Sequence, residues 1–182
     1  MTKILILVLA MAYSVNGVCA SGSPASPVAT GLSGPSVSHE DWKWPADPSE
    51  AHFGFLMGLG VLDSSAGVAL LGTASKKIVH QGFVPDLNNS VSIELQAGPL
   101  FIEGGRAFAY STHLRWDFRR DGLWTFYSLG GVAGHVTNNS QGNRFLMFPR
   151  FGVGAMRDSS LGFAMRGELS HEFITFGLVW PI

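Results

Sequence analysis

Residues 107–119 alternate between two kinds of side chain, and this pattern limits the folds open to the chain. The even positions are large and apolar, apart from Thr112, while the odd positions are small, polar or charged. Successive side chains of a β-strand point to opposite faces, so the segment predicts a strand with one apolar and one wet face. Aromatic residues lie near both ends of the apolar face. This arrangement is typical of a strand that crosses a bilayer, with lipid outside and a polar barrel interior inside.

The first twenty residues have the parts of an export signal. Lys3 supplies the positive charge, residues 4–12 form an apolar run too short to span a bilayer as a helix, and residues 18–20 offer small side chains before a cleavage site after Ala20. The residues around Cys19 fit a lipidation box poorly. Because Cys19 is the only cysteine, cleavage after Ala20 predicts a mature chain without a disulfide or a thiolate metal ligand.

Composition and turn-forming residues divide the chain into three parts. We predict a signal peptide at residues 1–20, a flexible Ser/Pro/Gly-rich periplasmic leader at 21–50 and a barrel at 51–182. Charged residues make up only 14% of the chain and the net charge is −1, without a basic run that would favour nucleic acid. Past the signal, no apolar run is long enough for a spanning helix. Such a composition suits a membrane β-barrel or a soluble β protein with a large core.

The rest of the chain is a series of strand-like runs between turn signals. The expected strands are residues 52–62, 66–79, 90–102, 107–119, 123–136, 144–156, 161–170 and 173–182. Short connections order them as an antiparallel meander, and closing the sheet removes the edges that lipid cannot pair. The predicted fold class is all-β: an eight-stranded antiparallel up-and-down transmembrane β-barrel with a flexible N-terminal leader.

The two longest expected loops, residues 80–89 and 137–143, follow the second and fifth strands and therefore fall on opposite sides. Outer-membrane barrels place their long loops on one side. Either one strand is miscounted, or residues 80–89 fold inward or lie against the rim.

These features together resemble the small outer-membrane β-barrels of Gram-negative bacteria, the OmpA-, OmpX- and OmpW-like group. The likeness covers residues 51–182 and rests on the signal, the two-faced strands and the closing segment 173–182. In this group the last strand ends with an aromatic residue that the assembly machinery is thought to read. Here Trp180 is followed by Pro181 and Ile182, so the aromatic lies two residues early. The resemblance implies a bacterial outer-membrane location and contact with the barrel assembly machinery through the C-terminal strand.

Alternation along the strands places polar and charged residues on the inner face and aromatic residues on the outer face. Opposite charges in a confined interior should pair, because a lone buried ion is very costly and arginine offers a planar fork to carboxylates. The expected polar network of the lumen is Glu94, Gln96, His113, Arg115, Asp117, Arg150, Arg166 and Glu168. The expected lipid-facing aromatic residues are Phe53, Phe55, Phe108, Tyr110, Trp116, Phe118, Phe176 and Trp180.

A catalytic interpretation competes with the structural one. Ser111, His113 and Asp117 share a face and are the parts of an acyl-transfer site, but the strand rise puts Asp117 about 13 Å from His113, too far to orient it. Ser170 and His171 lie beside Glu168, yet neighbouring strand residues point to opposite faces. We therefore predict no catalytic residue. The six histidines are scattered without ligand spacing, so we predict no metal and no cofactor.

The favoured function is that of an integral outer-membrane barrel of structural or interaction type, with a charge-paired and plugged lumen and exposed loops. Its expected partners are outer-membrane lipid, the assembly machinery and an unidentified extracellular or periplasmic protein, but not nucleic acid. Three alternatives stay open: a small conducting path, a lipid A or phospholipid acyl hydrolase or acyltransferase, and a soluble periplasmic lipocalin-like barrel. In the soluble barrel, Phe108, Leu114 and Trp116 would line the cavity while Arg115 and Asp117 meet water.

Overall fold

The computed structural model of the chain describes residues 49–62, 65–102, 105–139 and 142–182. The expected signal peptide and nearly all of the expected leader therefore lie outside the described residues. None of the described residues belongs to a helix that is long and apolar enough to cross a membrane.

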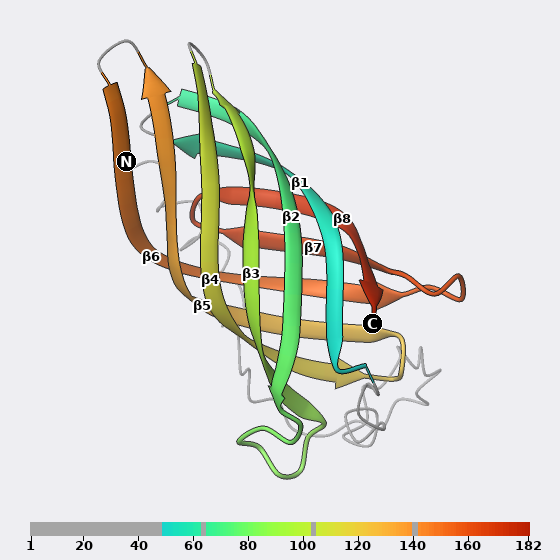
Figure 1. Cartoon of the computed structure of the whole chain (residues 1–182). Helices are drawn as coiled ribbons and strands as arrows, with labels where there is room; N and C mark the ends of the chain where they lie inside the picture. The colour runs from blue at the N-terminus through green and yellow to red at the C-terminus, as the bar shows by residue number, and fades with distance from the viewer. Residues whose placement is uncertain (1–48, 63–64, 103–104, 140–141) are drawn as a thin grey trace, which may run out of the picture. The chain divides into compact units, whose positions relative to one another are not determined.

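Eight antiparallel strands form a closed barrel in chain order (Figure 1). The strands are β1 (Ala51–Leu62), β2 (Ser65–Val79), β3 (Asn89–Ile102), β4 (Gly105–Arg120), β5 (Trp124–Asn139), β6 (Gly142–Asp158), β7 (Ala164–Ser170) and β8 (Phe173–Pro181). Each strand pairs with the next, and β8 pairs with β1 to close the ring. The predicted all-β, eight-stranded antiparallel barrel is confirmed.

The alternation in sequence becomes an inside and an outside. On β1, Leu56 is 2% exposed while its neighbour Phe55 is 66% exposed. On β4, Arg115 is buried and Leu114 is exposed. Polar and charged side chains therefore fill the interior, and large apolar side chains cover the exterior of every strand.

The interior also holds two apolar clusters. One contains Leu71, Leu100 and Phe173 with several small alanines, and lies toward the end where β1 joins β2 and β3 joins β4. The other contains Tyr127, Met156 and neighbours on β7 and β8. These inward apolar residues blur the period of two, which is why β2 and β5 look mixed in the sequence.

The prediction of an exposed loop at residues 137–143 is wrong. β5 continues to Asn139 and β6 begins at Gly142, with these two residues directly paired. Asparagine and glycine favour the backbone of a tight hairpin, so their presence marks the turn but not its length. This correction removes the conflict between two long connections on opposite sides.

The seventh strand is shorter than expected, because residues 161–163 belong to the preceding turn. Gly162 there has φ of 80°, a left-handed conformation that favours glycine. The backbone N–H of Leu161 donates to Ser159 Oγ at 3.2 Å. The apolar residues at 161 and 163 continue the alternation of β7 in the sequence, although they lie in the turn.

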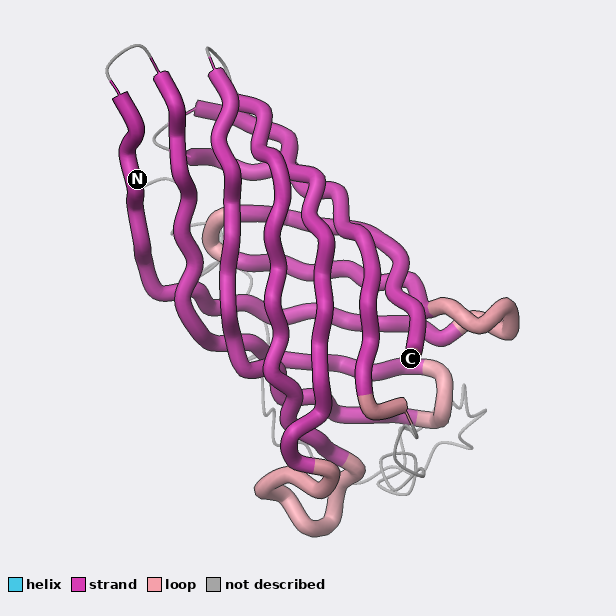
Figure 2. The backbone as a smooth tube through the Cα atoms, in the orientation of Figure 1, coloured by secondary structure: helices cyan, strands magenta, loops and turns pink. Residues whose placement is uncertain are grey.

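The connection between β2 and β3 spans residues 80–88 and is anchored against the rim. Asn89 Nδ2 donates to the carbonyl oxygens of Val84 and Leu87, both at 2.7 Å, and Trp116 Nε1 donates to Asn89 Oδ1 at 2.9 Å. The ring of Phe83 also packs edge-on against Trp116, with centroids 5.8 Å apart. The loop lies at the same end of the barrel as the C-terminus (Figure 2).

Candidate functional site: the ion cluster in the lumen

Glu94 is the centre of the interior ion cluster, and its side chain is fully buried. Arg166 makes a two-point contact with it: Nη2 donates to Oε1 at 2.7 Å and Nη1 to Oε2 at 2.9 Å. Arg115 Nη1 donates to Glu94 Oε2 at 2.6 Å. A carboxylate held by two guanidinium groups has the strong, charge-assisted bonds that a buried anion requires.

Glu168 is a second centre that shares Arg166 with the first. Arg166 Nη2 donates to Glu168 Oε2 at 2.6 Å, and Arg150 Nη2 donates to Glu168 Oε1 at 2.5 Å. Gln96 links the two carboxylates, because its Nε2 lies 2.8 Å from Glu94 Oε1 and 3.3 Å from Glu168 Oε2. β3, β6 and β7 are thereby joined across the lumen.

Arg115 and Tyr127 extend the cluster toward the C-terminal end of the barrel. Arg115 contacts Asp117 at two points, Nε to Oδ1 at 2.7 Å and Nη2 to Oδ2 at 3.0 Å. The guanidinium groups of Arg115 and Arg166 lie 5.4 and 4.9 Å from the centre of the Tyr127 ring, a cation–π distance. Arg166 Nε also donates to the Tyr127 hydroxyl at 2.8 Å.

The structure places all eight residues of the expected lumen network in the interior, and brings them into one connected cluster. His113 joins it with Nε2 3.2 Å from Glu94 Oε1. The cluster contains as many arginines as carboxylates, so the formal charges of these six side chains balance. Balanced, multiply bonded charges are the arrangement in which burial is least costly.

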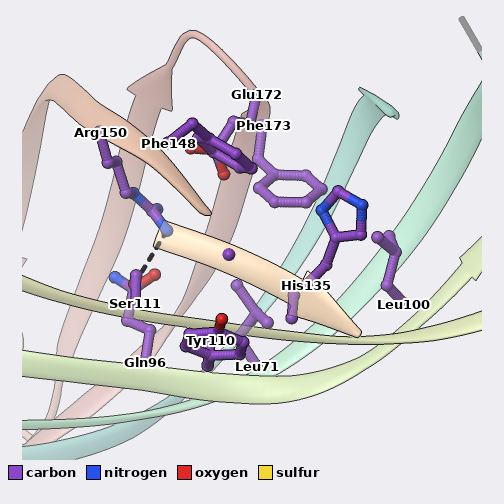
Figure 3. Close-up of a pocket in the computed structure, with 12 residues that line it drawn as sticks. Leu71, Gln96, Leu100, Tyr110, Ser111, His135, Phe148, Arg150, Glu172 and Phe173 are labelled. Atoms are coloured by element: carbon purple, nitrogen blue, oxygen red, sulfur yellow. Dashed lines mark hydrogen bonds between the residues drawn. The ribbon is translucent and has the colours of Figure 1, made fainter. Parts of the chain in front are cut away.

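Two small cavities flank the cluster. One of about 10 Å³ is lined by Ser111, His135, Arg150, Glu172 and others (Figure 3), and another of about 20 Å³ is lined by Lys77, Arg115 and Asp117 among others. Spaces of this size hold about one water molecule. Neither offers room for a drug-sized or lipid-sized ligand in the state described.

The residues of the catalytic interpretation have other partners. Ser111 Oγ accepts a hydrogen bond from Arg150 Nη1 at 3.1 Å, while His113 faces Glu94. Ser170 Oγ caps the β7–β8 turn by accepting from the backbone N–H of Phe173 at 3.1 Å. His171 is exposed, opposite in orientation to the buried Ser170. Each serine is thus used as a structural hydrogen-bonding group.

The structure places the eight expected lipid-facing aromatic residues on the outer face of the strands. Phe53, Phe55, Phe108 and Phe176 are exposed, and Tyr110, Trp116, Phe118 and Trp180 are half-buried. Several pack against aromatic neighbours on the same face. The rings of Phe53 and Trp180 are 5.5 Å apart, and those of Trp116 and Phe118 are 4.8 Å apart.

Sequence reasoning missed three interior residues of the site: Tyr127, His135 and Glu172. Tyr127 and His135 lie on β5, where inward Leu129 and Ala133 obscure the alternation. Glu172 lies in the β7–β8 turn, where no period applies. The only available signal was a charged residue directly before the apolar closing segment 173–182.

The close fit around Tyr127 gives a test of the cluster. A Cβ on Gly154 would overlap the Tyr127 ring and lie 2.5 Å from the carbonyl oxygen of Gly167. We expect Gly154→Ala to lower the free energy of unfolding by about 1–3 kcal/mol, the usual cost of overpacking. Urea unfolding of the protein in lipid vesicles would measure it. Gly130→Ala is the matched control, because its Cβ would meet Phe151 at an ordinary 3.6 Å; equal loss in both variants would contradict the close fit.

Comparison with known proteins gives structural likeness without sequence kinship. No protein-family model matches the chain, and no curated protein matches it. A designed transmembrane β-barrel aligns with a TM-score of 0.48 at 13% identity, covering 76% of this chain and all of the other. Ail, the attachment invasion locus protein of Yersinia pestis, in a complex with the heparin analogue sucrose octasulfate, aligns with a TM-score of 0.47 at 12% identity, covering 72% of this chain and 94% of the other. The closed eight-stranded topology rests on the chain's own strand pairing.

Proposed function

We propose that the chain is an integral outer-membrane β-barrel of structural or interaction type whose lumen is plugged by its own ion cluster. The observation that carries the proposal is the inside-out distribution of side chains. Phe55, Met57 and Phe176 are each more than 60% exposed, while Glu94, Arg115 and Arg166 are at most 2% exposed. An exterior of this kind is stable in hydrocarbon and adhesive in water.

The soluble ligand-binding alternative needs the opposite arrangement of faces. Its cavity would be lined by Phe108, Leu114 and Trp116, but these side chains lie on the outer face, and Arg115 and Asp117 are buried. The observed distribution of apolar and charged side chains therefore favours a barrel surrounded by lipid over a barrel that encloses an apolar ligand.

Location in the outer membrane is tested by fractionation and gel migration. We expect the protein to remain with the outer membrane through salt and carbonate washes and to need detergent for release. Unheated samples should migrate differently from heated ones, because a closed barrel resists unfolding by detergent until it is heated. Release by salt alone, with identical migration, would contradict membrane insertion.

The proposed plug makes a separate prediction. The ion cluster links β3, β4, β6 and β7 across the lumen, and the flanking cavities hold about one water each. We expect the folded protein to give no stepwise conductance in a planar bilayer. Steady single-channel steps from the wild-type protein would favour the small conducting path instead, provided that a known porin in the same membrane supplies the positive control.

The partners belong to the same proposal. β8 alternates outward Ile174, Phe176 and Leu178, which supports recognition of this strand by the assembly machinery. The longest described connection, residues 80–88, lies at the end that carries the C-terminus. If chain termini face the periplasm, as we propose, a loop-binding protein partner would meet the barrel on that side.

A further inference from the structure

The wall of the barrel has an opening beside β6. This strand begins at Gly142, but its pairing with β7 begins only at Gly152, opposite Ser170. Residues 145–151 pair with β5 along one edge, and within the described part of the chain the other edge has no strand partner. The β7–β8 turn ends short of the β5–β6 hairpin (Figures 1 and 2).

Exposure of an inward-facing residue marks the opening. Leu146 lies directly opposite His135 in the β5–β6 register, so the two side chains share the inner face of the barrel. His135 is 3% exposed, whereas Leu146 is 45% exposed. The difference arises because Leu146 borders the open edge, where β7 would otherwise cover it.

The opening lies within the apolar exterior. Phe108, Val136 and Phe145 are in register across β4, β5 and β6, and Phe108 and Phe145 are exposed. Met147 and Phe151 on the open strand are exposed as well. Hydrocarbon offers no hydrogen bonds to a free strand edge, so an edge at this level needs another source of polar groups.

The chemistry of the edge favours a lipid over an added strand. Pro149 lies in the middle of the unpaired segment, and proline lacks the N–H that a complete ladder requires. Proline on an edge is a known obstacle to strand addition. A lipid has no ladder to complete, and it supplies both an acyl chain and polar groups near the chain's attachment.

A small polar cavity lies on the lumen side of the opening. Glu172 is buried there, and within the described residues its Oε1 accepts no hydrogen bond and lies 3.5 Å from His171 Nε2. The Phe148 ring stands between an exposed and a buried histidine, with its centroid 5.6 Å from that of His171 and 6.1 Å from that of His135. Behind it lies the small cavity that His135, Arg150 and Glu172 line (Figure 3).

We propose that this opening is a binding site for a lipid of the surrounding bilayer, with an acyl chain against Leu146 and Phe148 and the polar groups at its attachment directed to the unpaired edge of β6. The site rests on the proposed membrane insertion. Phe148 closes the cavity behind the lipid, so the acyl chain lies along the wall and not in the lumen.

Nitroxide accessibility separates this site from the membrane insertion on which it rests. Single cysteines at Leu146, Phe176 and Met156, in a Cys19→Ser background, would carry the spin label in vesicles of phosphatidylethanolamine and phosphatidylglycerol. Position 176 is on the exposed outer face, and position 156 is buried in the lumen. Collisions with oxygen report hydrocarbon, and collisions with a polar nickel chelate report water. Heat-dependent gel migration establishes that each labelled variant is folded.

We expect the label at 146 to resemble that at 176, with oxygen collisions exceeding nickel collisions, while the label at 156 is shielded from both. A label at 146 that collides mainly with nickel would show a water-filled opening and overturn the lipid site. Shielding from both reagents at 146 would show a protein cover, such as an added strand, and would also overturn it. Nickel-dominated collisions at 176 would instead refute membrane insertion itself.

Discussion

Replacing Glu94 with alanine is expected to lower the free energy of unfolding by about 3–5 kcal/mol, the usual cost of leaving buried charges without their partner. Glu94 accepts hydrogen bonds from Arg115, Arg166 and Gln96, so its removal takes one of two carboxylate partners from each arginine and leaves the buried cluster with one more arginine than carboxylates. Urea unfolding of the protein in lipid vesicles, followed by the heat-dependent gel shift, would measure the loss.

Glu50 provides the matched control. It is a carboxylate with an exposed side chain, and it contacts His80 Nε2 at 2.8 Å. Exposed ion pairs contribute little, so Glu50→Ala should change the free energy of unfolding by less than about 1 kcal/mol. A Glu94 variant as stable as the Glu50 variant would show that the ion cluster does not hold the strands together.

The second large effect is expected on the outer face. Phe176 is 66% exposed in the middle part of β8, where we propose that it faces the bilayer. Phe176→Arg should cost about 2–4 kcal/mol in vesicles, the penalty for arginine near the midplane of a membrane barrel. The same equilibrium unfolding experiment measures it.

Ile182 is the control for depth. It is 75% exposed at the chain end, beyond β8. Near the interface an arginine costs about 0–1 kcal/mol, so Ile182→Arg should be almost neutral. In a barrel surrounded by water, arginine in place of an exposed apolar side chain would cost little at either position, and that result would refute the membrane assignment.

The sequence predicts which residues face inward more reliably than it predicts their partners. Alternation on β3 and β4 was enough to direct Glu94 and Arg115 to the interior, since a shift of one residue would reverse both faces. It could not predict that Glu94 meets Arg166, because that contact joins residues 72 positions apart and depends on the tilt and register of several strands.

Local irregularities in the strands explain the features that the sequence did not predict. The register between β2 and β3 shifts at Lys77 and Val79, which breaks the period at the end of β2. The opening beside β6 depends on the length of β7. The apolar residues Leu161 and Phe163 made the turn before β7 look like part of that strand in the sequence. An alternation with a period of two therefore cannot predict features that depend on where a strand ends.

The pairing of β8 with β1 sets the order in which the molecule can assemble. His52 pairs with Pro181, and Ile182 N donates to the carbonyl oxygen of Ala51 at 2.9 Å, so the ring closes only when the final residues are in place. Neighbouring hairpins join segments that are close in sequence, whereas this seam joins the two extremes of the barrel and bears the greatest loop-closure entropy. We therefore expect the seam to form last during folding, and a chain shortened by one strand to keep its hairpins as an open, adhesive sheet.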